Sequence, residues 1–132
     1  MERWEQWVPI DHIPQPIYLD SLVDGHEGIV MRFSSEDSEK KVLVQFDGVV
    51  CSYRNTDEGR LLKTWDFLSR HYGDQFYSTW PLFKVKHSEY LNWFLKESAG
   101  IYEDIEVTHY VFITPHDVVD VLSTFAPRVM IE

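Results

Sequence analysis

Apolar and polar residues alternate along the first third of the chain. Residues 29–33 and 42–46 carry an apolar side chain at every second position, on either side of a polar stretch. This period of two is typical of strands with one buried face. Asp47-Gly48 is a dipeptide favoured in tight hairpins, and the apolar run 49–53 follows it. Residues 17–54 are therefore predicted to form a meander of about three or four antiparallel strands.

The spacing of the apolar residues changes after residue 55. Thr56 can accept hydrogen bonds from the first turn of a helix, acidic residues follow it where the helix dipole favours them, and Gly73 is a typical helix stop. A helix is therefore predicted over residues 56–72, with its apolar stripe at Leu61, Trp65, Leu68 and Tyr72.

Strand and helix patterns then alternate. Residues 82–86 predict a short strand, and Ser88 caps a helix that carries apolar residues at 91, 94 and 95 and ends at Gly100. Residues 105–113 alternate and are apolar on both sides, which predicts a strand in the middle of a sheet. Thr114, followed by a proline and an acidic residue, resembles a helix start. A third helix is therefore predicted, with its stripe at 118, 121, 122 and 125, and then an edge strand over 129–131.

Length and composition limit the architecture. The first 16 residues include tryptophans and prolines, which predicts an irregular arm pinned by aromatic side chains. A chain of 132 residues with 44% hydrophobic content is expected to form one domain over residues 1–132. The predicted fold class is α+β, with one mainly antiparallel sheet of about five or six strands and three helices mostly on one face.

Charge excludes several kinds of partner. The chain has 12 Lys and Arg against 22 Asp and Glu, a net charge of −10. Phosphate backbones and anionic membranes repel such a chain, so we expect neither nucleic-acid nor membrane binding. A basic protein is the partner that this charge favours. The single cysteine and the absence of a signal-peptide pattern lead us to expect a cytoplasmic protein.

No motif specifies a chemistry. Cys51 and His109 could serve as a nucleophile and a base, but both lie within apolar strand patterns, where a packed side chain is the simpler interpretation. The histidines have no metal-ligand spacing, and no glycine-rich phosphate loop is present. We therefore assign no catalytic residue, no metal and no cofactor.

Acidic clusters and aromatic residues are the remaining candidates for a function. Carboxylates beside exposed aromatic rings would suit a basic protein surface, because tryptophan, tyrosine and arginine often anchor interfaces. The candidate partner-binding residues are Glu36, Asp37, Tyr53, Arg54, Asp57, Glu58, Trp80, Trp93, Glu103 and Asp104.

Two segments carry a resemblance of type. Residues 53–58 (YRNTDE) and 87–94 (HSEYLNWF), with His109-Tyr110, resemble stretches of small acidic proteins from Gram-positive bacteria, of the type of the immunity proteins of polymorphic-toxin systems. The resemblance attaches no activity to these segments and brings no site residues with it. The proline-rich arm departs from the pattern of the SUKH immunity family, to which we do not assign the chain.

Three functional hypotheses remain. The first is a non-enzymatic acidic protein-binding domain, such as an immunity protein that neutralises a basic toxin. The second is a small enzyme or ligand-binding domain that uses Cys51, His109 or the group of Arg54, Asp57 and Glu58 in a pocket. The third is an accessory protein that associates with itself as a homodimer.

Overall fold

Two antiparallel sheets and three helices make up the described fold, an α+β architecture. The computed structural model describes residues 1–36 and 38–132. One sheet has five strands in the order β1 (Arg3–Gln6), β6 (Leu82–Lys86), β7 (Thr108–Ile113), β8 (Asp117–Ser123) and β5 (Ser52–Asp57). The other has four, in the order β2 (Tyr18–Gly25), β3 (Gly28–Ser35), β4 (Ser38–Phe46) and β9 (Arg128–Ile131). The helices are α1 (Leu62–Tyr72), α2 (Gln75–Ser78) and α3 (Glu89–Glu97), and a 3-10 turn, η1 (Glu58–Arg60), precedes α1.

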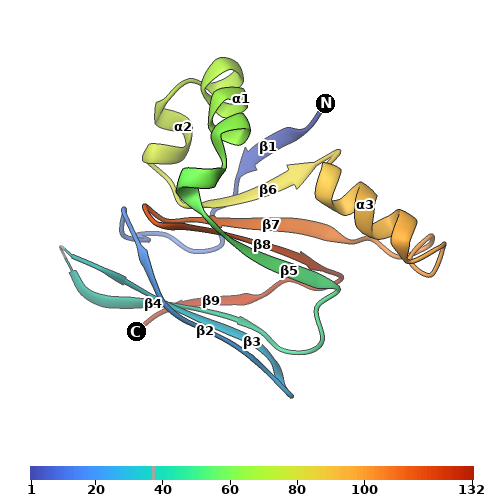
Figure 1. Cartoon of the computed structure of the whole chain (residues 1–132). Helices are drawn as coiled ribbons and strands as arrows, with labels where there is room; N and C mark the ends of the chain where they lie inside the picture. Colours follow the sequence, from blue (N-terminus) through green and yellow to red (C-terminus); the bar gives the residue numbers. More distant parts are fainter. Residues whose placement is uncertain (37) are drawn as a thin grey trace.

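The five-stranded sheet is the middle layer, with the helices on one side of it and the four-stranded sheet on the other (Figure 1). Successive side chains of a strand point to opposite faces, so alternate residues of β7 pack into two different cores. Tyr110 and Phe112 join the core between the two sheets. Val111 and Ile113 join the core beneath α1 and α2, with Leu68 of α1. The predicted central strand is confirmed: β7 is the middle strand of five, although it begins at Thr108 rather than at residue 105.

The predicted meander is confirmed for its first three strands only. β2, β3 and β4 pair in sequence as antiparallel neighbours. The predicted return strand after Asp47-Gly48 is wrong, because β5 begins at Ser52 and pairs with β8 in the other sheet. The backbone N–H of Cys51 already donates to Leu122 of β8. The segment after β4 therefore carries the chain from one sheet to the other, and the predicted single sheet is in fact two.

The third predicted helix is also wrong, because residues 117–123 form strand β8. Thr114 does make a cap-like hydrogen bond, accepting from the backbone N–H of Asp117 at 2.8 Å, but its own backbone N–H donates to the Asp117 carbonyl and closes a turn from β7 into β8. Val118, Val119 and Val121 are buried on the two faces of this strand. Such a β-branched run suits a strand that is covered on both sides.

The other two predicted helices are present. α1 ends at Gly73, which has a positive φ of 85°, as predicted. It starts later than predicted because Thr56 and Asp57 belong to β5, and the Asp57 carboxylate caps η1 instead. α3 begins after Ser88, whose Oγ accepts from the backbone N–H of Leu91 at 3.0 Å, as predicted. The short α2 is a helix that the sequence analysis did not predict.

Both ends of the chain add edge strands. The arm predicted to be irregular contains β1, which pairs with β6, because Trp4 is buried against Phe83 with ring centres 5.9 Å apart. Residues 7–17 form no helix or strand, in agreement with the prediction for the rest of the arm. At the other end, β9 pairs with β4 at the edge of the four-stranded sheet, which confirms the predicted edge strand.

Candidate functional site

A groove of about 450 Å³ runs between α3 and the edge strand β5. We call it the α3–β5 groove. It is formed by Ser52, Tyr53, Arg54, Glu89, Tyr90 and Trp93. The candidate residues Tyr53 and Arg54, which are neighbours on β5, therefore meet Trp93, which lies about 40 residues later in the chain.

Helix α3 has one buried side chain. Tyr90 is its buried residue, whereas the predicted apolar stripe is only partly covered: Leu95 is 36% exposed and Leu91 and Phe94 are half-buried. The Tyr90 ring stacks on Trp93, with ring centres 5.9 Å apart and an angle of 16° between the planes. Trp93 is 52% exposed, so its other face is open to solvent. An exposed indole is thus held in place by a buried neighbour.

Arg54 fixes the position of Tyr90 from below. Its guanidinium lies 4.1 Å from the centre of the Tyr90 ring, and the Tyr90 hydroxyl is hydrogen-bonded to the Ser52 hydroxyl. Burial raises the pKa of Tyr90, so the phenol stays neutral and keeps this hydrogen bond. A cation over the face of an aromatic ring is attracted by the ring quadrupole. These contacts order one wall of the groove.

A buried polar network lies beneath Arg54. Asp120 accepts from Arg54 Nε at 2.9 Å through Oδ2, and its Oδ1 lies 2.7 Å from His109 Nε2. The other ring nitrogen of His109 is hydrogen-bonded to Ser88 Oγ at 2.7 Å. With Nε2–H donating to Asp120, the Ser88 hydroxyl donates to Nδ1. The network links β5, β8, β7 and the start of α3.

The chain of hydrogen bonds from serine to histidine to aspartate matches that of a hydrolase triad, but its surroundings are those of a packing network and not of an active site. Ser88 is fully buried, and its oxygen caps α3 by accepting from Leu91. A nucleophile must reach the substrate, and this hydroxyl has no exposed face. We therefore interpret Ser88, His109 and Asp120 as a satisfied buried network, the simpler of the two interpretations that the sequence left open for His109.

Carboxylates lie at one end of the groove. Glu2 Oε2 accepts from the backbone N–H of Glu89 at 2.9 Å, and Glu2 Oε1 accepts from Trp4 Nε1 at 3.3 Å. Glu2 and Glu89 also line a small cavity of about 120 Å³, together with Asp120. Anions are favoured at a helix N-terminus, which accounts for both positions. This end of the groove therefore carries negative charge.

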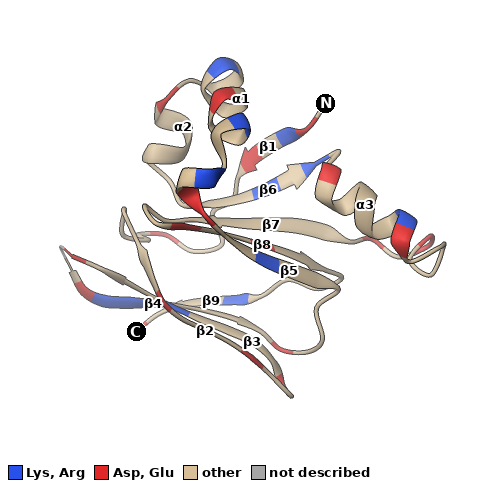
Figure 2. Cartoon of the chain, in the orientation of Figure 1, with Lys and Arg blue, Asp and Glu red and all other residues tan. Residues whose placement is uncertain are grey.

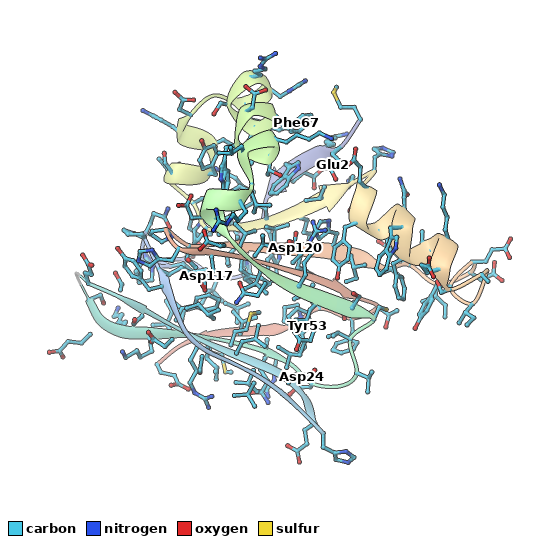
Figure 3. The ribbon with its side chains drawn as sticks, viewed as in Figure 1. Glu2, Asp24, Tyr53, Phe67, Asp117 and Asp120 are labelled. Atoms are coloured by element: carbon cyan, nitrogen blue, oxygen red, sulfur yellow. The ribbon has the colours of Figure 1, made fainter. Side chains whose placement is uncertain are left out.

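Tyr53 lies at the opposite end, where the two sheets come close. Figure 3 shows it beside Asp24 of β2. Partial burial, together with the charge of Asp24 and a hydrogen bond to it, raises the pKa of Tyr53. Tyr53 therefore joins the groove to the second sheet.

The remaining candidate residues are spread over the described structure. Trp80 is half-buried, and its Nε1 donates to the Trp7 carbonyl at 2.8 Å. Asp57 caps η1, and Glu58 follows it at the far end of β5. The acidic side chains lie on strands as well as on helices, hairpin tips and loops (Figure 2). Glu36 lies after β3 and Glu103 and Asp104 lie in the turn after α3, whereas Asp37 is outside the described residues.

Other site chemistries find little support. Burial raises the pKa of Cys51, which disfavours the reactive thiolate. Among residues 1–36 and 38–132, no three His, Cys, Asp or Glu side chains gather to hold a metal ion. None of the described helices has the length and apolar character needed to cross a membrane.

Three residues of the groove were not identified from the sequence: Ser52 of β5, and the neighbouring pair Glu89 and Tyr90 of α3. The place of this pair directly after the capping Ser88 is the signal that could have found it, because the first turn of a helix that starts on a sheet faces that sheet. No family model, no curated protein and no solved structure matches this chain, so the comparisons assign it to no family.

Proposed function

We propose that this chain is a non-enzymatic protein-binding domain, and that the α3–β5 groove docks a basic protein, as an immunity protein docks its toxin. The observation that carries the proposal is Trp93, which is 52% exposed yet stacked on a buried tyrosine. Tryptophan, tyrosine and arginine are the residue types that most often dominate binding energy. A side chain that is already ordered loses less entropy on binding.

Charge supports a basic partner. Glu2 and Glu89 stand at one end of the groove, and Asp120 offsets the positive charge of Arg54. The whole chain carries a net charge of −10. Such a field accelerates encounter with a cationic protein and weakens as salt rises.

A comparison of two variants tests this proposal. Tagged wild-type protein, Trp93→Ala and Leu62→Ala are each used to capture partners from a lysate of the native host. Leu62 is the matched control because it is 74% exposed and lies at the start of α1, away from the groove. We expect one basic protein to be captured by the wild type and by Leu62→Ala, released by salt, and bound about tenfold or more weakly by Trp93→Ala. Equal capture by all three proteins contradicts the proposal.

Self-association is the second candidate, because apolar side chains are exposed on the other side of α3. Leu95 is 36%, Ile101 73% and Ile105 50% exposed. Leu95 and Ile105 also line a cavity of about 320 Å³. Sedimentation over a concentration series tests this. We expect a dimer through this face to keep its dimeric mass on dilution, and the Ile101→Asp variant to sediment as a monomer.

A further inference from the structure

A further cavity lies at the far end of β5, away from Trp93. Its volume is about 420 Å³, within the usual range for small-molecule sites. It is lined by residues of the segment 15–16, η1, α1, the end of α2, and the end of β7 with the turn that follows it. The α3–β5 groove and this cavity share no lining residue. We call it the η1 cavity.

Two aromatic side chains form one wall of the η1 cavity. The rings of Trp65 and Tyr77 lie with centres 4.9 Å apart, tilted by 32°. Trp65 Nε1 donates to the Glu58 carbonyl at 2.8 Å, and the Tyr77 hydroxyl is hydrogen-bonded to Ser69 at 3.2 Å. The polar atoms of both side chains are therefore engaged with the protein. What they offer a ligand is the π surface of their rings.

Gln15 and Glu58 supply acceptors that lack partners. Gln15 Nε2 donates to the Ser78 carbonyl at 2.9 Å, which leaves Gln15 Oε1 screened from solvent and without a hydrogen bond in the described structure. The backbone N–H of Glu58 donates to His116, but within residues 1–36 and 38–132 its carboxylate has neither an ion pair nor a hydrogen bond. Buried polar atoms are almost always hydrogen-bonded, so an orphan acceptor in a cavity wall calls for an explanation.

The lining of the η1 cavity contains no lysine, arginine or histidine. Its chemistry is thus a half-buried carboxylate, a carbonyl oxygen without a partner, and aromatic and proline surfaces. An anion would be repelled by Glu58 and would find few donors. A metal ion would find one carboxylate where it needs several oxygen ligands.

We propose that the η1 cavity binds a guanidinium or primary ammonium group carried on a short alkyl chain. Such a group donates N–H bonds to the Glu58 carboxylate, and its charge is attracted to the faces of Trp65 and Tyr77. Gln15 Oε1 is screened from solvent in this structure, so it accepts from the group only once the Gln15 side chain turns toward the cavity. Its alkyl chain packs against Pro16 and Pro115, which also line the cavity. This site is independent of the α3–β5 groove and goes beyond the proposed binding of a protein there.

Butylguanidinium and butylurea form the matched pair of probes, because they have nearly the same shape and differ in charge. The chain is labelled with ¹⁵N-tryptophan, which gives one indole signal for each of its 5 tryptophans. Trp65→Phe assigns the Trp65 signal. We expect butylguanidinium to shift that signal saturably while the Trp93 signal stays in place, and butylurea to bind about tenfold or more weakly.

Two glutamate variants complete the test. Glu58→Gln removes the charge from the cavity and should weaken butylguanidinium about tenfold. Glu89→Gln makes the same change in the α3–β5 groove and should leave the affinity unchanged. The proposal is overturned if butylguanidinium gives no saturable shift, if the two probes bind equally, or if Glu58→Gln binds as well as the wild type.

The same titration identifies the source of the cation. Agmatine and a blocked tripeptide with a central arginine both carry a guanidinium group on a short alkyl chain. Agmatine presents it as a free small molecule, and the tripeptide presents it on a peptide backbone. Binding of agmatine alone supports a small-molecule ligand, and equal binding of the tripeptide supports an arginine of another protein; failure of both overturns the site. Trp93→Ala leaves all of these affinities unchanged, which separates this test from that of the proposed function.

Discussion

The guanidinium of Arg54 lies 4.1 Å from the centre of the Tyr90 ring, and its Nε donates to Asp120 at 2.9 Å. One side chain of β5 thus joins an aromatic residue of α3 to a buried carboxylate of β8. Tyr90 is the buried residue of α3. The position of that helix, and of the exposed Trp93 on it, therefore depends on Arg54.

Replacing Arg54 with alanine should destabilise the fold. The change removes the contact with the Tyr90 ring. It also removes one of the two hydrogen bonds to the carboxylate of Asp120, a residue that is 4% exposed. Because the arginine side chain is itself 50% exposed, we expect the free energy of unfolding to fall by about 1–2 kcal/mol. Urea unfolding followed by circular dichroism measures it.

Arg70→Ala is the control for this substitution. Arg70 also pairs with an aspartate, Asp66, one helical turn away, but both side chains are largely exposed. Such pairs contribute roughly 0.3–0.5 kcal/mol. A loss as small for Arg54→Ala as for Arg70→Ala would show that Arg54 does not hold α3.

Removal of Asp120 should cost more. Asp120→Ala leaves the buried Nε2–H of His109 without an acceptor and Arg54 without its carboxylate. We expect the free energy of unfolding to fall by about 2–4 kcal/mol. In the double variant with Arg54→Ala the two losses should not add, because both act on one bond. Additive losses, measured in the same urea series, would contradict the network.

The strand β8 shows what periodicity alone cannot decide. Val118, Val121 and Leu122 fit both the spacing of a helical stripe and a strand that is apolar on both faces. Thr114 also favours a helix at this point in the sequence, because its hydroxyl can accept a backbone N–H bond both in a turn and at a helix cap. What settles the conformation is the pairing of this segment with β5 and β7, a long-range contact that local pattern does not contain.

The candidate site was predictable in part for the same reason. Tyr53, Arg54 and Trp93 were identified by residue type, and the structure brings them to one groove. Their partners Tyr90 and Asp120 were not identified. Tyr90 lies on a helix face that the apolar stripe at 91, 94 and 95 does not include, although its place after the capping Ser88 could have indicated it, and Asp120 lies in the segment predicted as a helix. Residue type alone therefore identifies side chains suited to binding, whereas the buried residues that hold them in place depend on tertiary packing.

The pair of Asp47 and Arg128 predicts a local dependence on pH. Two hydrogen bonds, at 2.6 and 3.1 Å, join the Arg128 guanidinium to this carboxylate. They lower the pKa of Asp47 below the usual 3.8. A lowered pKa means that the pair stabilises the fold above pH 3.8 and that this contribution is lost as the pH falls through the lowered pKa.

An NMR titration of the Asp47 carboxyl tests that assignment. Arg128→Ala should return the pKa of Asp47 toward 3.8, whereas Arg70→Ala should leave it where it is. An Asp47 pKa that does not respond to Arg128→Ala would show that the pair is not formed in solution.

Cys51 should react slowly with thiol reagents in the folded chain. Burial raises its pKa, which lowers the fraction of thiolate near neutral pH. We expect the absorbance change with an aromatic disulfide reagent to be slower for native protein than for protein unfolded in urea. Cys51→Ser gives the baseline, since the chain has 1 cysteine. Labelling of the native protein as fast as of the unfolded one would reopen a reactive role for this thiol.

Gly28 and Gly73 offer a matched test of the close approach between β3 and the end of β4, because both have a positive φ but differ in their surroundings. A Cβ at Gly28 would lie 2.0 Å from the Phe46 carbonyl oxygen and 2.7 Å from that of Gly48, whereas one at Gly73 would meet nothing within 4 Å. Gly73→Ala should therefore cost only its backbone strain, about 1–3 kcal/mol. Gly28→Ala forces the start of β3 away from the end of β4, where the chain leaves for the other sheet, and should cost about 3 kcal/mol or more. Equal losses for the two variants in urea unfolding would mean that β3 and the link after β4 do not approach each other as described.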